Sequence, residues 1–82
     1  MNANNDDVRR ILEDTLSRPL PANDADLWES GVIDSLAVME LVEALEQRFS
    51  VVFDADHLRK ENFRSVAAIG ALLERAARKA PQ

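Results

Sequence analysis

The chain contains no cysteine and only one histidine among its 82 residues. It can therefore form no disulfide, no thiolate metal site and no cysteine nucleophile, and a lone histidine leads us to expect no metal ion. No apolar run approaches the length of a membrane span. The first residues are polar and acidic, unlike a signal or transit peptide. We therefore expect a cytoplasmic protein that does not insert into membranes.

Positive charge is also scarce, since 10 basic residues face 15 acidic ones and leave a net charge of -5. This balance argues against binding to nucleic acid or to an anionic membrane. Residues 19–47 carry seven acidic side chains and no lysine or arginine, whereas residues 48–82 sum to +3. Such a block is often only a solvated face, but it also predicts a partner with a basic surface.

The length allows one small domain, residues 1–82, with a single core and little room for a deep substrate cavity. Hydrophobic periodicity predicts an all-α fold. We expect a small, irregular four-helix bundle of three long helices and one short one, with a long loop between the first two. The expected helices span residues 5–18, 34–50, about 54–61 and 65–76. The candidate caps are Asn5, Asp6 or Asp7 for the first helix, Asp54 or Asp56 for the third and Ser65 for the last, and residues 80–82 are expected to fray. Pro19 and Pro21 end the first helix, and Leu27, Trp28, Val32 and Ile33 anchor the loop.

The helix at 34–50 has the most regular apolar stripe, and its side chains are expected to face the core. Residues 51–53 are β-prone but lack an evident partner strand, so we predict an extended connector. Leu36 falls on the opposite, acidic face of the helix, where an apolar residue is out of place. The predicted core comprises Val8, Ile11, Leu12, Leu16, Val38, Leu41, Val42, Leu45, Phe49, Val52, Ile69, Leu72 and Leu73.

The local sequence argues against two hypotheses, a hydrolytic triad and a calcium-binding loop. Ser35 does not lie in a G-x-S-x-G turn, and His57 lies in a short polar segment, where an exposed or capping role is expected, so a hydrolytic triad is rejected. Calcium-loop frames that start at Asp24 or Asp54 lack the required glycine and the final glutamate. We therefore expect no catalytic residue. By itself, the Asp34-Ser35 pair predicts only a cap for the following helix.

One continuous stretch resembles the acyl carrier and peptidyl carrier proteins. The resemblance extends over nearly the whole chain and is most specific from the loop into the second helix, in Asp26-Leu27-Trp28-Glu29-Ser30-Gly31-Val32-Ile33-Asp34-Ser35-Leu36, Glu40-Leu41-Val42-Glu43-Ala44-Leu45-Glu46 and Phe49. It implies that Ser35, flanked by Asp34, receives phosphopantetheine from coenzyme A through a separate phosphopantetheinyl transferase. It also implies that the thiol of this arm holds a cargo as a thioester.

The subtype is indicated by departures from the fatty-acid carriers. Many of those have an acid two residues after the serine, where this chain has Ala37, and Gln47 and Arg48 interrupt the acids of the helix. The loop and the stretch Glu61-Asn62-Phe63 look more like free-standing carriers for amino acids or specialised acyl groups, including D-alanyl carriers.

The second helix also presents a predicted partner face, which we define as Leu36, Met39, Glu40 and Glu43. The transferase, an acyl- or aminoacyl-loading enzyme and downstream pathway enzymes are expected to dock there on a monomeric carrier, because this face lies next to Ser35. The alternative from another class is an unmodified helical adaptor that uses the same acidic face. Only modification of Ser35 separates the two.

Overall fold

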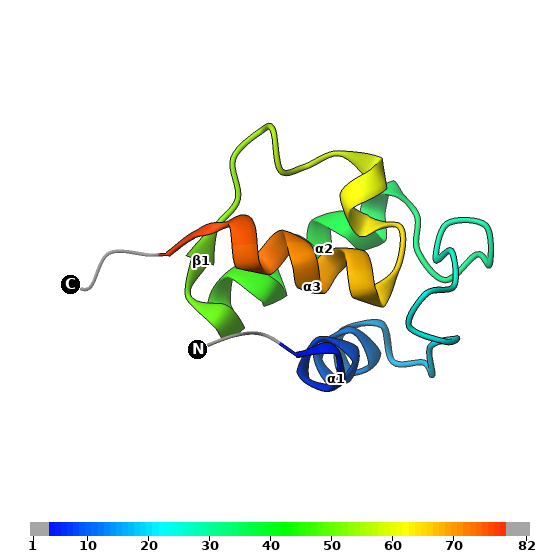
Figure 1. Ribbon diagram of the computed structural model, residues 1–82. Coiled ribbons are helices and arrows are strands. Elements are labelled where there is room, and N and C mark those ends of the chain that lie inside the picture. Colours follow the sequence, from blue (N-terminus) through cyan, green and yellow to red (C-terminus); the bar gives the residue numbers. More distant parts are fainter. Residues whose placement is uncertain (1–3, 79–82) are drawn as a thin grey trace.

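The computed structural model describes residues 4–78 and contains three α-helices, α1 (Asn5–Leu16), α2 (Ser35–Phe49) and α3 (Val66–Arg75) (Figure 1). A one-turn 3₁₀ helix, η1 (Lys60–Phe63), precedes α3, and two short strands, β1 (Val51–Val52) and β2 (Ala77–Arg78), complete the fold. The all-α prediction is confirmed. A four-helix bundle is not, because among the described residues the fourth helix is only this 3₁₀ turn. Within residues 4–78, no helix has both the length and the apolar character needed to cross a membrane.

Each α-helix begins at a side chain that accepts a backbone hydrogen bond. Asn4, rather than the predicted Asn5, Asp6 or Asp7, caps α1 by accepting from the Asp7 N–H at 2.8 Å. Ser65 caps α3 as predicted, accepting from the Ala68 N–H at 3.0 Å. Such caps satisfy donors that have no partner inside the helix.

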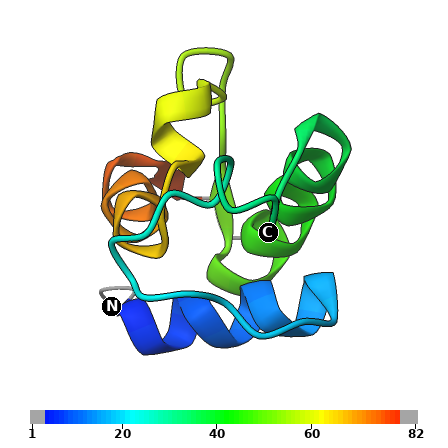
Figure 2. The same cartoon turned by 90° about the vertical axis from the view of Figure 1, so that its right-hand side faces the viewer.

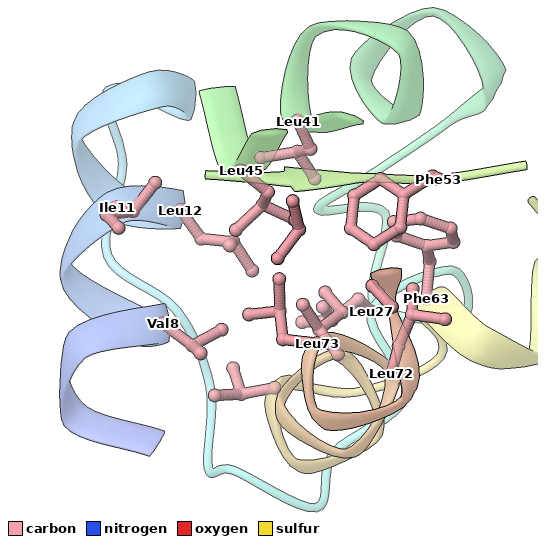
Figure 3. Close-up of a cluster of buried hydrophobic side chains, with 14 of the residues drawn as sticks. Val8, Ile11, Leu12, Leu27, Leu41, Leu45, Phe53, Phe63, Leu72 and Leu73 are labelled. Carbon is pink, nitrogen blue, oxygen red and sulfur yellow. The ribbon is translucent and has the colours of Figure 1, made fainter. Parts of the chain in front are cut away.

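The core lies where α1, α2 and α3 meet (Figure 3). Of the predicted core, Val8, Ile11, Leu12, Leu41, Leu45, Ile69, Leu72 and Leu73 are buried. Leu16, Val38, Val42 and Phe49 are only partly buried and pack against that core. Further buried apolar side chains come mainly from the connecting segments and from α3, and these are Leu27, Ile33, Val51, Phe53, Phe63, Val66 and Ala76.

The segment after α2 corrects two predictions. Val51 and Val52 do have a partner strand, because β1 pairs antiparallel with β2 in the register Val51 to Arg78 and Val52 to Ala77. Since strand side chains alternate, Val51 points into the core and Val52 remains 44% exposed, so its predicted burial was wrong. The expected fraying at Ala80–Gln82 lies outside the described residues.

The predicted short helix at 54–61 is also wrong. The Asp54 side chain accepts from the His57 N–H at 3.2 Å, and His57 Nδ1 accepts from the Asp54 N–H at 3.1 Å. These reciprocal bonds close a turn instead of starting a helix, and they confirm the capping role expected for His57. Helical structure begins later, at Lys60.

The long connection from α1 to α2 runs back along α1 before it crosses to α2 (Figure 2). Hydrogen bonds tie it to its neighbours. The Arg9 guanidinium of α1 donates to the carbonyls of Leu20 and Pro21 and to Asn23 Oδ1. Further along, the Leu27 N–H donates to the Arg64 carbonyl at 2.7 Å, and the Leu27 side chain is fully buried. These contacts fix the end of the loop that leads into α2.

Candidate functional site

Ser35 is the first residue of α2 and is exposed to solvent. The preceding residue, Asp34, is the N-cap: its Oδ1 accepts from the Ala37 N–H at 2.8 Å and its carbonyl accepts from the Val38 N–H at 3.0 Å. The cap predicted for this helix is thereby confirmed as Asp34. Since α2 starts directly after this cap, Ser35 lies in the first turn of the helix with its side chain exposed.

The backbone around Ser35 suits a negatively charged substituent. No acceptor among residues 4–78 receives the N–H of Ser35 or of Leu36, and the Ser35 hydroxyl makes no hydrogen bond within the same residues. Free N–H groups and the positive end of the helix dipole stabilise an anion placed there. The Asp34 carboxylate opposes this effect, so its contribution here is the cap rather than anion binding.

The turn that leads to Ser35 is organised by Asp26. Its carboxylate accepts from the N–H groups of Trp28 at 2.9 Å and Glu29 at 3.0 Å, and it pairs with Arg64 Nε at 3.2 Å. The hydrogen bond from Glu29 is the largest cause that lowers the pKa of Asp26 below its ordinary value; the bond from Trp28 and the Arg64 charge act in the same direction, against partial desolvation. Asp26 therefore ties this turn to the residues just before α3.

Gly31 lies at the bend between this turn and α2. Its φ of +77° lies in the left-handed region, which residues with a Cβ adopt at a cost. Apart from Gly31 itself and its two chain neighbours, no residue has an atom within 4 Å of the position that a Cβ would take, so space does not require glycine there. The positive φ of the backbone is what favours glycine at this position.

The predicted partner face is exposed as a unit on α2. Leu36 is 72% exposed and Met39 is 63% exposed, and Glu40 and Glu43 are exposed beside them. Exposure of Leu36 was expected from its place opposite the core stripe, and it is confirmed. The face begins one residue after Ser35, so the structure brings together all six residues that the sequence singled out.

Ser35 also borders a groove of about 390 Å³ between α2 and the segment from Leu58 to Phe63, which the sequence did not predict. The groove is lined by Trp28, Ser35, Val38, Met39, Val42, Leu58, Arg59, Lys60 and Phe63. The available signal was the adjacent pair Arg59-Lys60, but its proximity to Ser35 depends on how the chain returns toward α2 after β1.

A family model described as "phosphopantetheine attachment site" matches residues 6–73. This span contains α2, η1 and nearly all of α1 and α3. The chain belongs to the phosphopantetheine-binding carrier proteins. A comparison with curated proteins found no significant match.

The carrier family has phosphopantetheine as its covalently attached prosthetic group, and its domains are generally non-catalytic. The site of this carrier is compatible with such a group. Attachment needs an accessible hydroxyl, which Ser35 supplies, and room beside it, which the groove supplies.

Among residues 4–78, neither a histidine at the groove nor a metal-binding cluster accompanies Ser35. His57 does not line the groove that Ser35 borders, and its Nδ1 is occupied within its own turn. Across residues 4–78, no three histidine, aspartate or glutamate side chains gather as a metal site would require.

Proposed function

We propose that this carrier holds an acyl or aminoacyl cargo as a thioester on a phosphopantetheine arm at Ser35 and delivers it to partner enzymes of a biosynthetic pathway. The observation that carries the proposal is the exposed Ser35 hydroxyl at the start of α2, within the span matched by the family model. The absence of cysteine agrees with it, since no protein thiol competes for the thioester.

The surroundings of the other serines in the described chain favour Ser35. Ser30 Oγ donates to the Leu27 carbonyl at 3.2 Å, and Ser65 is buried with its Oγ engaged in the cap of α3. Ser17 and Ser50 are exposed, but each is a C-cap, where the helix end is negative and disfavours an added phosphate. Ser35 alone combines an exposed hydroxyl with a positive helix end.

The partner face is proposed as the surface that the transferase and the loading enzyme read. Both enzymes must reach the arm at Ser35, and the exposed Leu36 and Met39 lie directly along their approach. Glu40 and Glu43 are proposed to attract a basic surface and set its orientation, while Leu36 supplies apolar contact. Carriers of this family generally interact with such enzymes.

Three further statements stay predictions. We predict that no residue of this chain makes or breaks a bond of the cargo, that the carrier is a monomer and that it works in the cytoplasm. We also keep residues 1–82 as a single carrier domain. The adaptor alternative has no observation in its favour beyond the acidic face, which the carrier reading uses as well.

The test is modification of the purified chain by a promiscuous phosphopantetheinyl transferase with coenzyme A. The parent should gain the mass of one phosphopantetheinyl group, and Ser35→Ala should gain none. Circular dichroism of the variant should match the parent, because an exposed first-turn serine adds little to stability. Equal modification of the parent and a folded Ser35→Ala variant would reject the assignment.

A further inference from the structure

The groove beside Ser35 has an apolar floor and a small volume. Val38 and Val42 of α2 and Phe63 of η1 line it, together with the more exposed Met39 and Leu58. Its volume of about 390 Å³ is near the lower end of the range for small-molecule sites, roughly 300 to 1,000 Å³. A short organic group fits such a space.

The charged side chains that line this groove are all positive. Arg59 and Lys60 line it, and no aspartate or glutamate does. Within residues 4–78, neither cation forms an ion pair, whereas Arg9 and Arg64 each pair with an acid. In a protein with a net charge of -5, two unpaired cations beside the candidate attachment serine are a local reversal of sign.

Trp28 holds one of these cations at the groove. The Lys60 ammonium lies 5.0 Å from the centroid of the Trp28 ring, within the range of a cation–π interaction. The Trp28 indole N–H is buried and finds no acceptor among the described residues. Because Trp28 lines the groove, its indole N–H reports on changes there. The charged groups that the groove offers to a ligand are the two cations, Arg59 and Lys60.

We propose, resting on the carrier function proposed for Ser35, that this groove binds the acyl cargo of the arm and favours a short cargo that ends in a carboxylate. The apolar floor accommodates its methylene groups, and Arg59 and Lys60 face its negative end. An aminoacyl cargo places an ammonium against the same two cations and is disfavoured by like-charge repulsion. The structure therefore favours an anionic acyl group over the amino-acid cargo indicated by sequence resemblance.

The experiment loads three cargoes of equal length and different charge. A promiscuous transferase attaches coenzyme A thioethers that carry a 3-carboxypropyl, a 3-carbamoylpropyl or a 4-aminobutyl group, which are stable to hydrolysis. Intact mass verifies each loading. Trp28 is the only tryptophan, so its indole N–H gives a single, assignable NMR signal.

The carboxylate cargo should move the indole signal several times further than the amide or the ammonium cargo. The pKa of its carboxyl should fall by about 0.5 relative to the free coenzyme A conjugate, as for a partly exposed ion pair. Both effects should disappear in Arg59→Met/Lys60→Met. They should persist in the matched control Arg10→Met/Arg48→Met, which removes two exposed cations away from the groove.

The possible failures are distinguishable. A chain that gains no mass contradicts the carrier function itself. A chain that loads all three cargoes with equal indole shifts leaves the carrier function intact and overturns the proposed cargo preference. An indole signal that moves fully with the unacylated arm, and no further with any cargo, shows that the cations serve the phosphodiester and also overturns it.

Discussion

The two faces of α2 differ in exposure although both carry large apolar side chains. On the inner face, Leu41 and Leu45 are completely buried against the core. On the outer face, Leu36 and Met39 are 72% and 63% exposed although they are apolar too. One helix therefore supplies both part of the core and the surface beside Ser35, and substitutions on the two faces should have separable effects on stability and on loading.

The largest expected effect is on the inner face. Leu45→Ala should lower the free energy of unfolding by about 2 to 5 kcal/mol, because it removes buried methyl groups and leaves a partly collapsed cavity. Denaturant unfolding measures this loss. Met39→Ala is the matched control on the outer face, and its cost should stay within about 0.5 kcal/mol. Similar costs for the two variants would contradict the division of α2 into two faces.

Substitutions of Gly31, at the bend that leads into α2, should change stability only through the backbone conformation at that position. Gly31→Ala should lower the free energy of unfolding by about 1 to 2 kcal/mol, since φ of +77° is unfavourable for a residue with a Cβ. Gly31→Asn should cost less, because asparagine tolerates this region better. The two variants are compared by urea unfolding, and equal costs would assign the effect to something other than the backbone.

Charge reversal should affect loading and leave the fold intact. Glu40→Lys/Glu43→Lys should slow modification by the transferase by about tenfold at low salt and flatten its salt dependence, because repulsion replaces attraction. The measurement is kcat/KM of modification against ionic strength.

The control variant changes the net charge by the same amount, at positions outside the partner face. Asp14→Lys/Glu74→Lys reverses two exposed acids on α1 and α3. Asp54 is unsuitable as a control because its side chain closes the turn with His57. Equal slowing in the two double variants would move the recognition surface away from α2.

The smallest expected effect concerns pH. Because hydrogen bonds from Glu29 and Trp28 and the charge of Arg64 lower the pKa of folded Asp26, ionised Asp26 stabilises the fold above the ordinary value of 3.8. That contribution should be lost as pH falls from about this value through the lower, folded pKa. Asp26→Asn should therefore show a shallower loss of stability over this acidic range in urea titrations. Parallel pH profiles of parent and variant would contradict the role given to Asp26.

Sequence patterns predicted the elements whose ends are set by contacts between residues close together in the chain. The cap at Ser65 and the span of α2 followed from side chains that bond within their own first turn. The strand pairing of Val51 with Arg78 joins residues far apart in sequence, and no local pattern revealed it. The short helix was misplaced because Asp54 caps a single turn as readily as a helix, and its bonds to His57 decide between the two.

The features of the site divide in the same way into those that the local sequence predicted and those that depend on tertiary packing. Exposure of Leu36 was predictable because a helical repeat fixes which residues oppose the core stripe. The groove was not, since Trp28, Arg59 and Phe63 reach it from separate segments whose approach depends on tertiary packing. Burial of Phe63 had no signal in a periodic pattern, because η1 is too short to form one.

The position of the arm tests the central claim most directly. The transferase-modified parent, digested and fragmented by mass spectrometry, should carry one phosphopantetheinyl group on the peptide containing Asp34, Ser35 and Leu36, with fragment ions that place it on Ser35. The group on Ser17, Ser30, Ser50 or Ser65, or an unmodified chain after full reaction of a reference carrier, would contradict the account.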